Sequence, residues 1–194
     1  MRSTTLIHVL WAFAFLSCAA STLLEGRDDL TLAILKPDIM GSNFWTGLSN
    51  DIRAAGFQVV HEKHFFFDEP LAETFYAEHK GKKFYQGLIN FMLSAPVTAL
   101  VLQQENAPSA FRELIGPTDP KTARAAHPNS LRAKYGTDVL QNAVHGSASV
   151  ADALHEINLL FPDWKPPPSK SMVYVGFSSC INAFLPLVLL PGWL

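Results

Sequence analysis

Cysteine is scarce in this chain. The 194 residues include two cysteines, Cys18 and Cys180, and each lies close to one end. A framework of internal disulfides is therefore excluded for the middle of the chain, which must be held together by its packing. The sequence also lacks a CxxC pair or a histidine-rich metal-binding spacing. We therefore expect no metal site built by the protein alone.

Two glycine-rich phosphate-binding motifs are missing as well. Neither the GxGxxG pattern of dinucleotide-binding domains nor the GxxxxGK[ST] loop of P-loop enzymes occurs in the sequence. The formal net charge is only −2 at pH 7. A chain with this charge has no overall positive surface to attract a nucleic acid, so we expect no nucleic-acid partner. Any phosphate site must therefore be a local gathering of lysines and arginines.

The first 21 residues have the order of a secretory signal peptide. Arg2 precedes an apolar run over residues 6–16, and small residues follow over residues 17–21. We therefore expect residues 1–21 to be a leader that directs the protein to the secretory pathway or out of the cell. The absence of acids before Glu25 also fits a mitochondrial presequence, and an uncleaved start on a cytoplasmic protein is the remaining alternative.

The C-terminal end combines a proline-rich linker with an apolar tail. Consecutive prolines in residues 164–171 favour an extended polyproline conformation. Residues 172–194 contain no charged side chain and are long enough to span a bilayer, although Pro186 and Pro191 would interrupt a helix there. The tail leaves two interpretations open, which are contact with a membrane and a hydrophobic strand packed on the core.

Residues 28–163 are predicted to form one domain in which strands and helices alternate. Apolar or strand-like runs occur over residues 30–35, 57–67 and 97–102. Helical spacing of apolar residues begins at Phe44, Glu69 and Ala107 and covers residues 84–95, and the last helix starts at a capping box, Ser149 to Asp152. Residues 116–130 hold three prolines and are predicted to be a loop. This order indicates an α+β fold whose sheet is covered by helices on one side.

His145 is the first candidate for chemistry, because it lies eleven positions before Glu156. A carboxylate that accepts from one imidazole nitrogen leaves the other available as a nucleophile. The spacing alone nevertheless favours a structural histidine near a turn, and Lys36 alone is typical of a solvated lysine. Arg112 and Arg132 fit surface charges equally well, although guanidinium groups also suit phosphate oxygens.

Across residues 30–162 the chain resembles the nucleoside diphosphate kinases. The resemblance rests on motifs that occur in the family's order: TLAILKPD at 31–38, FY at 75–76, FYQGL at 84–88, FMLSAPV at 91–97, RELIGPT at 112–118, SLR at 130–132, NAVHGS at 142–147, EI at 156–157 and FP at 161–162. It implies a ferredoxin-like α+β sandwich with a mainly antiparallel four-stranded sheet covered by helices.

The resemblance also implies a role for each matching residue. His145 would become phosphohistidine, with its ring oriented by Glu156 and Ser147, and Lys36 would assist catalysis. The base would stack on Phe84 beside Leu88 and Val139. The residues around the phosphates and the sugar would be Lys36, Tyr76, Arg112, Thr118, Arg132 and Asn142.

The activity implied is transfer of the γ-phosphate of ATP to nucleoside diphosphates by a ping-pong route, with Mg²⁺ carried on the nucleotide phosphates. Two departures from the family stand out. Ala148 occupies a position where the family usually has aspartate, and residues 118–132 form a longer segment that resembles the divergent homologues five and six. The longer segment leaves a homo-oligomer open but argues against the standard hexamer. The alternative function is a weakly active or inactive homologue that serves as a nucleotide-binding or interaction module.

Overall fold

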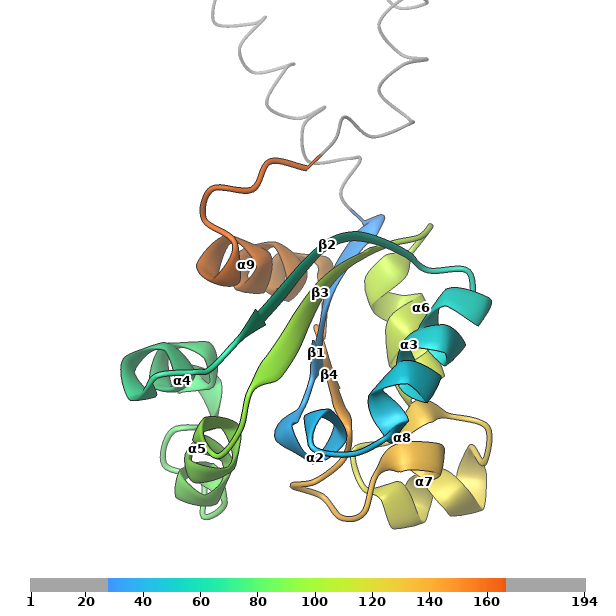
Figure 1. Cartoon of the computed structure of the whole chain (residues 1–194), viewed down its shortest axis with the longest axis horizontal. Helices are drawn as coiled ribbons and strands as arrows, with labels where there is room; N and C mark the ends of the chain where they lie inside the picture. The colour runs from blue at the N-terminus through green and yellow to red at the C-terminus, as the bar shows by residue number, and fades with distance from the viewer. Residues whose placement is uncertain (1–27, 167–194) are drawn as a thin grey trace, which may run out of the picture. The chain divides into compact units, whose positions relative to one another are not determined.

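The computed structural model describes residues 28–166 of the chain (Figure 1). The expected leader at residues 1–21 and the apolar tail at 172–194 lie outside the described residues, as does most of the proline-rich linker. No helix within residues 28–166 has both the length and the apolar character that a membrane crossing requires. Residues Asp28–Trp164 form one compact unit.

The four strands of the described part form a single antiparallel sheet in the order β2-β3-β1-β4. Their bounds are β1 Leu30–Leu35, β2 Gln58–Phe65, β3 Val97–Gln103 and β4 Val144–Gly146. The predicted antiparallel α+β fold is therefore confirmed. The central strand β1 places Ile34 directly opposite His145 of the short edge strand β4. This pairing fixes where the candidate nucleophile lies.

Helices surround the sheet (Figure 1). The α-helices are α2 Pro37–Met40, α3 Phe44–Ala54, α4 Glu69–Phe75, α5 Tyr85–Leu93, α6 Ala107–Ile115, α7 Pro120–Ala126, α8 Leu131–Tyr135 and α9 Val150–Leu160, and a short 3-10 helix covers Ala77–His79. The predicted helices that begin at Phe44, Glu69, Ala107 and after Ser149 are present, as is the one within 84–95. Phe44 itself is 55% exposed, so it is not one of the core residues of α3.

The prediction that helices cover only one side of the sheet is wrong. Leu32 and Ile34 of β1 pack into one apolar core with α4, α5 and α9, whereas Ala33 and Leu35 pack into a second core with α3 and α6. Every residue of β1 is consequently buried. A continuous apolar run such as LTLAIL is what a strand buried on both faces requires.

The prediction of a loop over residues 116–130 is also wrong, because α7 lies within it. The carboxylate of Asp119 accepts a hydrogen bond from the backbone N–H of Lys121 at 2.9 Å, and Pro120 occupies the first turn of the helix. Both residues are typical of a helix start. The alanine-rich segment that follows has too short an apolar repeat to reveal the helix from the sequence.

Gly146 allows β4 to lie directly on α6. A Cβ atom at this position would be 2.8 Å from the ring of Phe111 and 3.1 Å from Ile115 Cδ1. Because both neighbours are fully buried, Gly146→Ala should lower the free energy of unfolding by about 1–3 kcal/mol through overpacking. Urea denaturation measures this change. Gly87→Ala is the control: a Cβ at Gly87 has no neighbour within 4 Å, and alanine is the better helix former, so this variant should not lose stability. Equal stability of Gly146→Ala and the unchanged protein would contradict the expectation.

Candidate active site

A cavity of about 790 Å³ is lined by side chains that are widely separated in the sequence, from Lys36 to Glu156. Of the twelve residues predicted from the sequence to form a site, all except Ser147 line it: Lys36, Tyr76, Phe84, Leu88, Arg112, Thr118, Arg132, Val139, Asn142, His145 and Glu156. Ser147 is fully buried behind this wall. A volume of this size suits a nucleotide-sized ligand.

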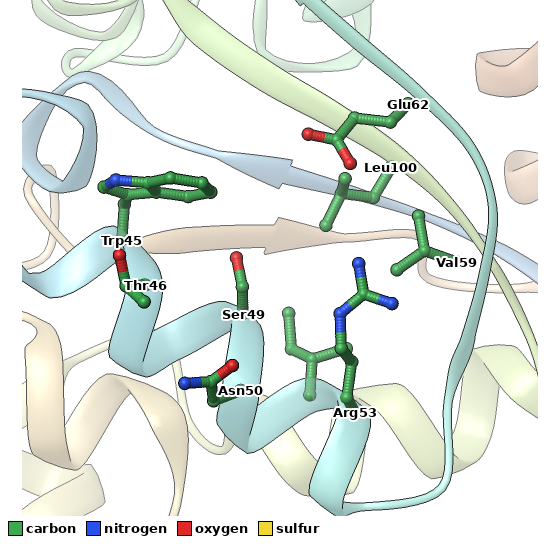
Figure 2. Close-up of a pocket in the computed structure, with 9 residues that line it drawn as sticks. Trp45, Thr46, Ser49, Asn50, Arg53, Val59, Glu62 and Leu100 are labelled. Atoms are coloured by element: carbon green, nitrogen blue, oxygen red, sulfur yellow. The ribbon is translucent and has the colours of Figure 1, made fainter.

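A second cavity, of about 200 Å³, lies against α3 (Figure 2). Figure 2 shows Trp45, Ser49 and Arg53 rising from that helix, with Glu62 and Leu100 on the opposite wall. This cavity contains none of the residues predicted to form the site and no histidine. The larger cavity is therefore the candidate active site.

His145 takes part in a chain of hydrogen bonds that extends into the sheet. Its Nε2 lies 3.0 Å from Oε1 of Glu156, and the hydroxyl of Ser147 donates to Glu156 Oε2 at 2.6 Å. The backbone N–H of Leu32 in turn donates to Ser147 Oγ at 3.2 Å. With Glu156 ionised, Nε2 carries the proton, which leaves Nδ1 as the unprotonated nitrogen.

The start of α9 explains how Glu156 reaches His145. Ser149 caps the helix by accepting from the backbone N–H of Asp152 at 3.2 Å, and its hydroxyl donates to the Asp152 carboxylate at 2.6 Å. The predicted helix start at Ser149 is thus present, although the Asp152 carboxylate binds the Ser149 hydroxyl and not its backbone N–H as in a full capping box. Ile157 and Leu160 pack against the sheet and fix the rotation of α9. This rotation turns Glu156 toward the cavity and β4.

Lys36 is buried, with a residue exposure of 5%. Its ammonium group donates to the carbonyl of Leu140 at 2.7 Å and to Oδ1 of Asn142 at 2.8 Å, and it lies 5.3 Å from the centroid of the Phe91 ring. Burial lowers the pKa of Lys36 to about 8, with Asp38 partly opposing the shift. The interpretation of Lys36 as a solvated lysine is therefore wrong.

Arg132 is also buried, at 6% exposure. Its guanidinium donates to the carbonyl of Gly116 at 2.9 Å and to that of Val144 at 3.0 Å, while its Nε has no partner among the described residues. Burial lowers the pKa of Arg132 to about 10, and the charge of Arg112 adds to the effect. Arg112 lies on the exposed side of α6. The interpretation of both arginines as surface charges is therefore confirmed for Arg112 and wrong for Arg132.

Aromatic side chains form the opposite wall. Phe84 is 53% exposed, and the ring of His79 meets it edge-on at 5.5 Å between centroids and stacks on Tyr76 at 6.2 Å. Burial raises the pKa of Tyr76 far above its ordinary value, and the charge of Glu156 adds to the rise. Tyr76 is therefore a neutral donor whose hydroxyl has no partner within residues 28–166. Leu88 is buried beside Phe84, and Val139 is exposed.

Sequence reasoning missed several residues that line the cavity. These are His79, Lys83, Leu140, Asp152 and His155. His79 carries no distinguishing spacing, and its five-residue separation from Phe84 acquires meaning only from the contact between the two rings. No group of three or more His, Cys, Asp or Glu able to hold a metal ion occurs within residues 28–166.

Comparison with known proteins connects this geometry to one family. The family model described as nucleoside diphosphate kinase matches residues 29–165. The chain is 45% identical over 133 residues to the nucleoside diphosphate kinase of Psychromonas ingrahamii, covering 69% of this chain and 90% of that protein. It is 44% identical over 133 residues to the thioredoxin domain-containing protein 3 homolog of Heliocidaris crassispina, where the match covers 69% of this chain but only 16% of that longer protein.

A solved structure gives the same result in three dimensions. The crystal structure of the Aquifex aeolicus nucleoside diphosphate kinase matches with a TM-score of 0.67 at 42% identity, and the match covers 69% of this chain and 94% of that one. The family model likewise leaves residues 1–28 and 166–194 unmatched.

Proposed function

Because this chain belongs to the nucleoside diphosphate kinase family, we propose that it transfers the γ-phosphate of ATP to nucleoside diphosphates through a phosphohistidine at His145. The proposal rests chiefly on one observation. Nε2 of His145 is engaged by Glu156 at 3.0 Å, and the ring lines a cavity that also holds buried Lys36 and Arg132. An oriented imidazole among phosphate-binding cations has the arrangement that phosphoryl transfer needs.

The first half-reaction forms a bond between His145 Nδ1 and the γ-phosphorus of ATP, while the bond from that phosphorus to the β–γ bridging oxygen breaks and ADP leaves. The ring becomes positively charged as it is phosphorylated. Glu156 stabilises that charge through the Nε2–H bond, and Ser147 keeps the carboxylate in place. A second nucleoside diphosphate then attacks the phosphorus, the P–N bond breaks, and neutral His145 is regenerated.

The remaining residues bind and orient the nucleotide. The guanidinium groups of Arg112 and Arg132 neutralise phosphate charge, and the ring of Tyr76 lines the same cavity with its buried hydroxyl behind it. Phe84 presents an exposed ring on which any base can stack, which fits a broad choice of nucleoside diphosphate. Mg²⁺ enters as part of the substrate, held by the nucleotide's own phosphate oxygens and by water.

The direct test gives the full-length protein Mg·ATP together with GDP, CDP or UDP and measures the triphosphate formed. We expect all three diphosphates to be phosphorylated. Protein labelled with γ-³²P-ATP and freed of nucleotide should pass its label to added GDP, because a ping-pong enzyme stores the phosphoryl group. Absence of both triphosphate and labelled protein would contradict the proposal.

A second function, a weakly active homologue that binds nucleotides, is favoured by one observation. Ala148, which stands where the family usually has aspartate, lines the cavity and offers no carboxylate there. On this alternative the protein binds ADP in calorimetry but forms phosphoenzyme and triphosphate only slowly or not at all. The same two assays therefore separate the two functions.

The pH dependence of nucleotide binding should follow Lys36. Its pKa of about 8 in the free protein means that the ammonium loses its proton as the pH rises above 8. Bound phosphates favour the protonated form, so the dissociation constant for ADP should be flat below about pH 8 and rise by up to about tenfold per pH unit above it. Calorimetry at several pH values measures this, with Lys36→Gln as control, which should bind weakly without that rise. A flat profile for the unchanged protein to about pH 9.5 would contradict it.

A further inference from the structure

Residues 142–144 form a strained turn directly before His145. The backbone N–H of Val144 donates to the carbonyl of Asn142 at 2.8 Å, which is a bond between residues two apart. The central residue, Ala143, has a φ of 70°. A γ-turn with positive φ at a non-glycine residue is rare and costs free energy, so it persists only where neighbouring groups hold it.

The neighbouring groups are two residues of the segment that follows β1. The backbone N–H of Lys36 donates to the carbonyl of Ala143 at 3.0 Å, and the carboxylate of Asp38 accepts from the N–H of Ala143 at 2.9 Å. Both polar backbone atoms of Ala143 are therefore bound from residues 36–38. Its methyl group is fully buried in the core shared with α3 and α6.

The turn separates two groups of the candidate site. On one side, Asn142 binds Lys36 through Oδ1 and donates to the carbonyl of Thr118 at 3.0 Å. On the other side, His145 meets Glu156. A relaxation of Ala143 to negative φ would redirect the chain at this point, and Asn142 and His145 could not both keep these partners.

We propose that Asp38 is a positioning residue, whose carboxylate holds Ala143 in its positive-φ conformation and thereby sets the placement of Asn142 relative to His145. Asp38 does not line the cavity and so does not touch the nucleotide. Apart from its effect on the charge of Lys36, it acts through the turn. The effect on rate rests on the proposed phosphoryl transfer, whereas the effect on the turn does not.

The test combines a loss with a specific suppressor in the full-length chain. Asp38→Ala removes the acceptor, Asp38→Asn keeps an oxygen that can accept, and Ala143→Gly removes the penalty of positive φ, because glycine adopts it freely. We expect Asp38→Ala to slow the labelling of His145 by ATP at least about tenfold, since small displacements of a reacting group are costly. Asp38→Asn should lose less, and Asp38→Ala combined with Ala143→Gly should return to within about threefold of the unchanged protein.

Amide hydrogen exchange of Val144, measured by NMR without nucleotide, reports the turn itself. Exchange should accelerate in Asp38→Ala and be restored in the double variant, even if the protein forms no phosphohistidine. The matched control is Asp119→Ala, which removes a similar carboxylate bond to a backbone N–H at the start of α7; Ala143→Gly should not reverse its loss of thermal stability. The proposal fails if Asp38→Ala leaves Val144 exchange unchanged, or if the double variant labels no faster than Asp38→Ala.

Discussion

Replacing His145 with alanine is expected to abolish phosphoenzyme formation and to lower the rate of nucleoside triphosphate synthesis by about 10⁴-fold or more, the scale seen when a nucleophile is removed from an enzyme. The reason lies in the site's composition. His79 also lines the cavity and meets a carboxylate, that of Glu78 at 3.5 Å from Nε2, but its Nδ1 is engaged by Lys82 at 3.0 Å, whereas Glu156 holds only Nε2 of His145. Labelling with γ-³²P-ATP followed by acid and base treatment measures this, because phosphohistidine is acid-labile and base-stable.

The cavity itself supplies a matched control. His155 lines the same cavity, next to Glu156, but no hydrogen bond within residues 28–166 orients its ring. His155→Gln should therefore keep the acid-labile label, whereas His145→Ala should lose it. Calorimetry with ADP should give similar affinities for both variants, because neither loses a cation that binds phosphate. Equal labelling of His145→Ala and the unchanged protein would place the phosphoryl group elsewhere and remove the proposed mechanism.

Local patterns in the sequence predicted the longer elements but not the environment of the site. The apolar run of β1 indicated a strand, yet counting apolar residues did not reveal that helices cover both of its faces. The three residues of β4 are too few to show a period, so His145 was expected near a turn. Only the order of motifs that resembles the family brought His145, Glu156 and Lys36 together from the sequence.

Burial and backbone strain were beyond local inference for a different reason. Lys36 and Arg132 are buried where backbone carbonyls and Asn142 accept most of their hydrogen bonds. These partners lie 104 and 106 residues from Lys36, and 16 and 12 residues from Arg132. The positive φ at Ala143 carried no signal either, since an alanine gives no hint of a conformation that glycine usually marks. Both features depend on tertiary contacts. These contacts oppose the preference of lysine and arginine for water and the preference of alanine for negative φ.

Arg132 should show the second-largest effect, because it serves the fold and the ligand at once. Arg132→Met keeps the length of the side chain but leaves the carbonyls of Gly116 and Val144 without their donor. The variant loses two charge-assisted hydrogen bonds, but it also removes a buried charge, which offsets part of that loss. The free energy of unfolding should therefore fall by about 2 kcal/mol. Losing one phosphate contact of about 2 kcal/mol should raise the dissociation constant for ADP about thirtyfold.

Arg124 separates the two roles. Its guanidinium also donates to two carbonyls, those of Ala133 at 3.4 Å and Gly136 at 3.0 Å, but it does not line the cavity. Arg124→Met should therefore cost some stability, about 1 kcal/mol or less since the side chain is more exposed, and leave ADP affinity unchanged. Urea denaturation and calorimetry on both variants measure the two effects separately. If both variants weaken ADP equally, Arg132 acts through the packing of α8; if only Arg132→Met does so, the buried guanidinium binds phosphate directly.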